Sequence, residues 1–249
     1  MKSIEVLFTP AEFTALKDRD LRETICVVFD VLRATSTMVT ALGNGAAGLV
    51  PVEQISEAIA YRARHPQVLL AGERQGVRIQ ADGVTFDLGN SPREFTPDAV
   101  GGRQIVMTTT NGTRALRACA HARRVLTASF LNLSATASAL ASCPPAPLLL
   151  VCSGTHEEAA YEDALGAGAL CDLLDRQAPD LTAADSALIA RRLWQVERAD
   201  PLHAISQSRN ARRLLSLPEL RDDVVYCLQP DRFPLVAELD ANGVVRRVP

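Results

Sequence analysis

Acidic, guanidinium and hydroxyl side chains follow an apolar, β-rich run near the start of the sequence, and together such groups can bind a phosphate ester. The run ends in FDVLRATST, which places Asp30 and Arg33 ahead of three hydroxyl residues that open a helical pattern. Mg²⁺ prefers carboxylate oxygen, and a guanidinium grips a phosphoryl group through two hydrogen bonds. We therefore treat Asp30 as a candidate metal ligand and catalytic residue, and Arg33 as a candidate catalytic phosphate ligand. The alternative is a structural role, with Asp30 capping the helix or pairing with Arg33.

An acid and a guanidinium recur side by side at the end of a second run, LLAGERQG. Here Glu73 is the candidate for a second metal ligand, and Arg74 or Arg114 is the candidate for binding a second anionic group of the substrate. A Glu-Arg pair without any role is the alternative, because surface loops often contain one. Downstream, FDLGNSP offers Asn90 and Ser91 as neutral substrate ligands, with an Asx turn before the proline as the competing interpretation.

Two further runs end in turns rich in hydroxyl groups and glycine. Backbone amides and hydroxyls that precede a helix can surround a tetrahedral oxyanion. Helix capping alone needs only one such group, so it explains the string TTTNGT poorly. The candidate substrate ligands in these two turns are Thr109, Thr110, Asn111, Gly112, Ser153, Gly154 and Thr155.

Two carboxylates stand early in the helical pattern that follows the last of these turns. In YEDALGAG, Glu162 and Asp163 are candidate catalytic residues that would orient a water molecule or complete the outer shell of a metal ion. The alternative is that they only complement the positive end of the helix or form a solvated face.

The runs that carry these groups alternate with Ala-rich helical patterns, which indicates an α/β fold. Because the central runs are almost continuously apolar, we expect strands covered on both faces in a layered α/β/α arrangement. Ligands of open α/β sheets bind beyond the carboxyl ends of the strands, so the candidate residues are predicted to meet in one pocket. The expected strands are 25–32, 67–73, 104–109, 124–130, 147–153 and 223–228, and the expected helices are 34–42, 53–64, 112–121, 132–141, 158–176, 182–197 and 200–216.

The change of pattern near the C-terminus bears on domain organisation. We predict one domain over residues 1–249, in which the part from about residue 180 forms a capping subdomain over the sheet. The dipeptide Asn242-Gly243 predicts a terminal hairpin with a type I′ turn.

Composition excludes several classes of partner. The net charge is −3 and only 4% of residues are aromatic, which argues against nucleic acid and against an anionic membrane surface. The start of the chain has no signal-peptide pattern, no stretch reaches the ~18 apolar residues of a membrane span, and the six cysteines form no C-x-x-C pair. We therefore expect a cytoplasmic protein with a small polar ligand. The subunit number stays open, with a homodimer as the commonest assembly.

Taken in order, FDVLRATST, AGERQG, FDLGNSP, TTTNGT, SGT and EDALGAG resemble the 2-phosphosulfolactate phosphatase (ComB) family over most of the chain. The segment 206–231 is similar to the closing segment of that family, although Asn210 stands where the family has glycine. The resemblance implies an α/β fold with a mixed sheet. It also implies a Mg²⁺-dependent phosphatase that converts 2-phospho-3-sulfolactate, or a related 2-phospho acid, to sulfolactate and phosphate in coenzyme M biosynthesis.

Two other functions remain open on the sequence alone. One is a phosphatase that forms a phosphoenzyme on Ser153 or Asp30 before water releases the phosphate. The other is a non-catalytic module that binds a small phosphorylated or sulfonated acid. The presence of four candidate catalytic carboxylates argues against the second.

Overall fold

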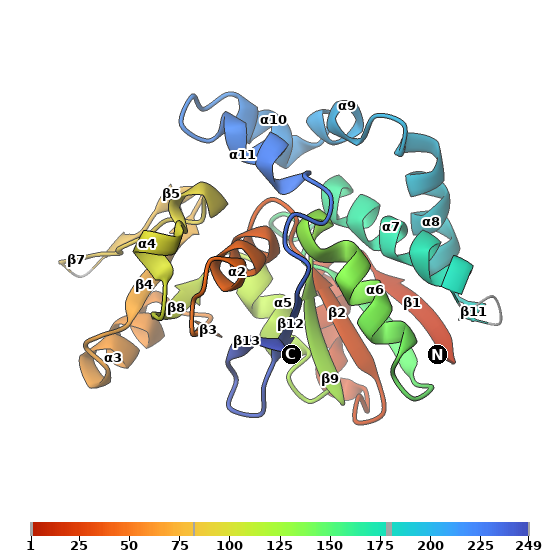
Figure 1. Cartoon of the computed structure of the whole chain (residues 1–249), viewed down its shortest axis with the longest axis horizontal. Coiled ribbons are helices and arrows are strands. Elements are labelled where there is room, and N and C mark those ends of the chain that lie inside the picture. The colour runs from red at the N-terminus through yellow and green to blue at the C-terminus, as the bar shows by residue number, and fades with distance from the viewer. Residues whose placement is uncertain (1, 82, 178–180, 249) are drawn as a thin grey trace.

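The computed structural model describes residues 2–81, 83–177 and 181–248 and is built on a mixed sheet with helices on both faces (Figure 1). This architecture confirms the α/β fold with a mixed sheet that the sequence predicts. Within the described ranges, no helix is long and apolar enough to cross a membrane.

One half of the sheet is a block of five parallel strands. In spatial order they are β11 (Thr182–Ala183), β1 (Ser3–Leu7), β10 (Pro147–Cys152), β2 (Ile25–Phe29) and β9 (Arg124–Ala128). Strand β2 is buried along its whole length, as its unbroken apolar sequence requires. Its Val27 lies opposite Leu150 on one side and Leu126 on the other. One face of this block packs against α6 (Leu133–Ala141), α7 (Tyr161–Gln177) and α8 (Asp185–Glu197).

The other half contains a second parallel block, formed by β3 (Gly48–Pro51), β8 (Gln104–Thr108) and β4 (Leu69–Arg74). Strand β4 turns back into the antiparallel β5 (Val77–Arg78) through Gln75 and Gly76. Both turn residues have positive φ, 54° and 76°, as a type I′ turn requires. Helix α3 (Ile55–Arg64) covers this block with Ala58 against Leu70 and Val106.

The C-terminal hairpin joins the two blocks. Its strand β12 (Val236–Leu239) pairs antiparallel with β9, and β13 (Val245–Val248) pairs antiparallel with β3. The predicted type I′ turn is wrong, because only Gly243 has a positive φ there. Instead, the Asp240 carboxylate accepts hydrogen bonds from the backbone amides of Asn242 and Val244, which form an Asx turn.

Two helices pack against strands of both blocks and so fix the blocks relative to each other. Helix α2 (Ala34–Gly43) contributes Met38, and α5 (Gly112–Ala118) contributes Leu116, to one apolar cluster. The same cluster contains Val28 of β2 and Met107 of β8. This shared core lets loops from the two blocks converge on one site.

The C-terminal helices lie across the top of the sheet in Figure 1, beyond α7. The predicted helix 200–216 is divided in two at Ser208, whose hydroxyl accepts a hydrogen bond from the Ala211 amide and caps the second part. The predicted strand 223–228 is wrong, because this segment is helical and buries Val224 and Cys227, three residues apart on one helix face. These helices are α9 (Pro201–Ser206), α10 (Arg209–Leu215) and α11 (Arg221–Cys227).

Strands β1 and β3 are absent from the sequence prediction, and the remaining elements are short. The segment 74–97 is largely irregular, as predicted, and carries a separate two-stranded sheet. The short elements are α1 (Pro10–Thr14), α4 (Pro97–Val100), β6 (Gln80–Ala81), β7 (Val84–Thr85) and the 3₁₀ turns η1 (Ala15–Asp18), η2 (Pro92–Glu94) and η3 (Phe130–Asn132).

Candidate active site

A pocket lies where loops from four strand ends meet helix α10, and we call it the strand-end pocket. The loops that follow β2, β4, β8 and β10 form its floor, and α10 contributes one wall. Each strand end supplies at least one polar lining residue: Asp30, Glu73, Thr110 and Thr155.

Asp30 is a largely buried carboxylate on the floor of the pocket. Its Oδ1 accepts a hydrogen bond of 3.0 Å from the Ala34 amide at the start of α2. Burial, together with the nearby charges of Glu73 and Glu162, raises the pKa of Asp30 from 3.8 to about 6. A Cβ at position 112 would lie 2.5 Å from Asp30 Oδ2, so glycine is required beside this carboxylate.

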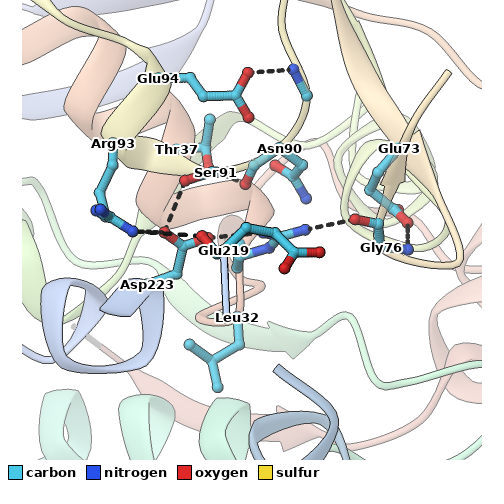
Figure 2. A network of polar contacts seen from close by, with 12 residues as sticks. Leu32, Thr37, Glu73, Gly76, Asn90, Ser91, Arg93, Glu94, Glu219 and Asp223 are labelled. Atoms are coloured by element: carbon cyan, nitrogen blue, oxygen red, sulfur yellow. Dashed lines mark hydrogen bonds and ion pairs between the residues drawn. The ribbon is translucent and has the colours of Figure 1, made fainter. Parts of the chain in front are cut away.

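Glu73 ties two of the loops together. Its Oε1 accepts hydrogen bonds of 2.9 Å from both the amide and the hydroxyl of Thr110, and its Oε2 accepts one of 2.6 Å from the Gly76 amide. Figure 2 shows Glu73 beside Gly76. The carboxylate therefore orders the turn after β4 and the turn after β8 while it faces the pocket.

Asp163 holds the loops that follow β2 and β10. Its Oδ1 accepts a hydrogen bond of 2.8 Å from the Val31 amide, and its Oδ2 accepts bonds of 3.1 Å from the Ser153 hydroxyl and the Gly154 amide. Burial, followed by the charges of Asp30 and Glu162, raises the pKa of Asp163 well above its usual range. The Ser153 hydroxyl is fully buried and bound to this carboxylate.

Glu162 lies next to Asp163 in the first turn of α7 and is 1% exposed. Burial raises the pKa of its carboxyl, which accepts a hydrogen bond of 3.2 Å from the Asn210 side-chain amide. The same amide nitrogen donates to the Leu32 carbonyl at 2.5 Å. Asn210 thereby fastens α10 to the loop that carries Asp30.

Arg33 lines the pocket as one half of a buried ion pair. Its Nη1 lies 2.7 Å from Asp223 Oδ2, and the two side chains are 3% and 0% exposed. Asp223 also accepts a 2.7 Å hydrogen bond from the Ser91 hydroxyl, and Figure 2 shows Asp223 reaching Ser91 and Arg93. Ser91 thus supports the ion pair and lies outside the strand-end pocket.

Two asparagine side chains, Asn90 and Asn111, line the strand-end pocket and differ in their hydrogen bonds. Asn111 lines it and donates from Nδ2 to the Ser153 carbonyl at 3.1 Å and to the His156 carbonyl at 2.7 Å. Asn90 also lines it, and its buried Oδ1 has no hydrogen-bond donor among residues 2–81, 83–177 and 181–248. That oxygen is free to accept a hydrogen bond from a ligand.

Several predicted ligands lie elsewhere. Arg74 points away from the strand-end pocket and donates to the carbonyls of Glu73 and Glu53 and to the Thr108 hydroxyl. Arg114 pairs with Glu157 at 3.0 Å. Neither placement fits the expected role in binding a second anion. Thr109 caps the start of α5, because its hydroxyl accepts a hydrogen bond from the Thr113 amide. Gly112 packs against the Asp30 carboxylate, where a side chain would clash. Thr155 lines the pocket, as expected.

The sequence prediction omits several residues of this region, and four of them bear directly on the site. Gln75, Arg213 and Asn210 line the pocket, and Asp223 supports it from behind. Asn210, Arg213 and Asp223 all lie in the segment 206–231, whose resemblance to the family's closing segment could have indicated them. The signal for Gln75 lay in its neighbour Gly76, since Gln-Gly between two short apolar runs is compatible with a two-residue hairpin turn.

The donor set suits Mg²⁺, although the described ranges contain no cluster of three or more His, Cys, Asp or Glu residues placed to hold a metal. Mg²⁺ is usually bound by one or two carboxylates, with waters and substrate oxygens completing its shell. Asp30 and Glu73 line the same pocket and supply such carboxylates. The raised pKa of Asp30 also means that a cation beside it would relieve an electrostatic penalty.

Comparisons with known proteins agree with one another. The family model described as 2-phosphosulpholactate phosphatase matches residues 11–242. A probable 2-phosphosulfolactate phosphatase of Caldicellulosiruptor saccharolyticus is 37% identical over 97% of this chain and 99% of its own length. The protein of the same description from Thermotoga petrophila is 42% identical over 88% of this chain and 89% of its own. The chain therefore belongs to the 2-phosphosulfolactate phosphatase family of phosphoric monoester hydrolases.

Proposed function

We propose that this protein is a Mg²⁺-dependent phosphatase that hydrolyses 2-phospho-3-sulfolactate, or a related 2-phospho acid, to sulfolactate and phosphate in the strand-end pocket. The observation that carries the proposal is that a buried carboxyl group, Asp30, and a buried guanidinium, Arg33, both line one pocket. Family membership supports the reaction class.

Asp30 and Glu73 are the proposed metal ligands. Glu73 already accepts three hydrogen bonds, and a carboxylate has roughly four lone-pair positions, so one remains for a metal ion. Mg²⁺ bound there would neutralise phosphoryl charge and lower the pKa of a bound water. Of the two Asp30 oxygens, Oδ1 accepts the hydrogen bond from the Ala34 amide and Oδ2 faces Gly112, so Oδ2 is the proposed metal ligand.

Arg33 and the turn residues are the proposed ligands of the phosphoryl group. The ion pair with Asp223 fixes the guanidinium before substrate arrives, so little reorganisation accompanies binding. Thr110, Asn111 and Thr155 line the pocket and are placed to bind phosphoryl oxygens. Hydrolysis forms one O–P bond from water and breaks the ester O–P bond, while water gives up a proton and the alcohol oxygen gains one.

Glu162 is the proposed group for orienting the attacking water, because burial raises its pKa and Asn210 links its carboxyl to the loop that carries Asp30. Asp163 is better supported as a positioning residue, since its two oxygens already accept three hydrogen bonds from the loops. Burial of the Ser153 hydroxyl argues against a phosphoenzyme on that residue.

The proposal is tested by measuring phosphate release from 2-phospho-3-sulfolactate with Mg²⁺, after treatment with excess EDTA, and after Mg²⁺ is restored. We expect activity to disappear with the chelator and to return with the metal. Full activity in EDTA would contradict the metal-dependent mechanism. Tight substrate binding without any phosphate release would indicate a non-catalytic binding module.

A further inference from the structure

Arg213 brings a second guanidinium to the lining of the strand-end pocket. It lies on α10 and donates a hydrogen bond to the carbonyl of Gln75 in the β4–β5 turn. A Cβ at Gly76 would lie 3.7 Å from its Nη2, so the guanidinium is held against this turn. The same turn donates to Glu73 and accepts from Arg33, which places Arg213 next to the proposed phosphoryl ligands.

Among the described residues, no carboxylate neutralises the charge of Arg213, because no Asp or Glu oxygen lies within 4.0 Å of its guanidinium nitrogens. Its neighbours differ in this respect, because Arg33 pairs with Asp223 and Arg209 pairs with Glu158. A guanidinium has five N–H donors, and most of those of Arg213 remain available to a ligand.

The location of this charge is fixed relative to the loop that carries Asp30 and Arg33. Asn210, on the same helix, donates to the Leu32 carbonyl and to Glu162, and the Ser208 hydroxyl caps the helix. Helix α10 is therefore bound to the segment that carries Asp30 and Arg33. The distance between Arg33 and Arg213 is set by these contacts and by the turn that both side chains touch.

We propose that Arg213 binds the second anionic group, a carboxylate or sulfonate, of a 2-phospho acid whose phosphoryl group lies at Arg33. This inference rests on the proposed function. Asp30 and Glu73 make the pocket acidic, so a substrate with several negative charges needs a cation beyond the one that Asp223 neutralises. Arg213 supplies it, and its planar donor array suits an oxyanion. Arg213 thereby selects esters that carry a second anion.

The test compares steady-state kinetics of the wild-type protein, Arg213→Gln and Arg213→Lys with Mg²⁺ on three substrates. 2-Phospho-3-sulfolactate carries a carboxylate and a sulfonate, 2-phospholactate carries only a carboxylate, and 4-nitrophenyl phosphate carries neither. Arg212→Gln is the matched control, because Arg212 is the preceding residue of α10, is exposed, and lies outside the pocket lining. Circular dichroism checks that each variant is folded.

We expect Arg213→Gln to raise KM about 10- to 100-fold for substrates with the second anion, with little change in kcat. Turnover of 4-nitrophenyl phosphate should be unchanged, Arg213→Lys should recover part of the loss, and Arg212→Gln should match the wild type. Loss for both acids identifies the carboxylate as the bound group, and loss for the sulfonated acid alone identifies the sulfonate.

An equal effect on all three substrates, or no effect on any, would overturn the inference while leaving the phosphatase function intact. If Arg213→Gln is unfolded, the inference is judged on Arg213→Lys by the same comparison. A wild-type protein that releases no phosphate from any of the three would instead refute the proposed function, and the inference would fall with it.

Discussion

Lowering the pH from 7.5 to 5.0 is expected to weaken Mg²⁺ binding, because the proposed ligand Asp30 becomes protonated over this range. With a pKa of about 6, about 97% of this carboxyl is ionised at pH 7.5 and about 9% at pH 5.0. A proton and Mg²⁺ compete for the same oxygens, so the apparent affinity should fall about tenfold.

The assay is isothermal titration of Mg²⁺ into the substrate-free protein at the two pH values and constant ionic strength. Asp30→Asn is the matched variant, since it keeps the size of the side chain and the carbonyl oxygen that accepts from Ala34. This variant should bind weakly at both pH values and show little pH dependence. Equal affinity of the wild-type protein at pH 7.5 and 5.0 would refute the reasoning, as would an unchanged pH dependence in Asp30→Asn.

Three further predictions follow from contacts within the site. Replacing Gly112 by Ala should lower phosphatase activity at least ~10-fold, because the added methyl would lie 2.5 Å from Asp30 Oδ2 and must displace it; an unchanged rate would contradict this contact. Asp223→Ala leaves the buried guanidinium of Arg33 unpaired and should lower the free energy of unfolding, measured with urea, by about 3–5 kcal/mol. Without metal, the raised pKa of Asp30 makes the wild-type protein lose stability as the pH rises from about 4 to about 6. Asp30→Asn should therefore be more stable than the wild type at pH 7.5, by up to about 3 kcal/mol in thermal or urea unfolding, and should show no such gain at pH 3.5.

The site residues at strand ends were predictable from the sequence, because ligands of open α/β sheets bind beyond the carboxyl ends of the strands. Asp30, Thr110 and Gly154 each follow a buried apolar run, and the structure brings all three to one pocket. The prediction for Arg74 overlooked the alternation of side chains along a strand. Glu73 and Arg74 are consecutive in β4, so when Glu73 faces the pocket, Arg74 must face the other way.

Other parts of the site depend on tertiary contacts that local sequence does not encode. Arg212 and Arg213 are equivalent in the sequence, and only the packing of α10 over the β4–β5 turn distinguishes them. The segment DVVYCL reads as a strand, yet it packs as a helix that presents Asp223 to Arg33. Periodicity could not separate these alternatives, because a short apolar run fits both.

We infer that the strand-end pocket hydrolyses a phosphate ester with Asp30 at its chemical centre. The most direct test is phosphate release from 2-phospho-3-sulfolactate with saturating Mg²⁺ by the wild-type protein and by folded Asp30→Asn. We predict a loss of at least ~100-fold in kcat, the size expected when a key electrostatic group is removed. A rate close to that of the wild-type protein would contradict the claim.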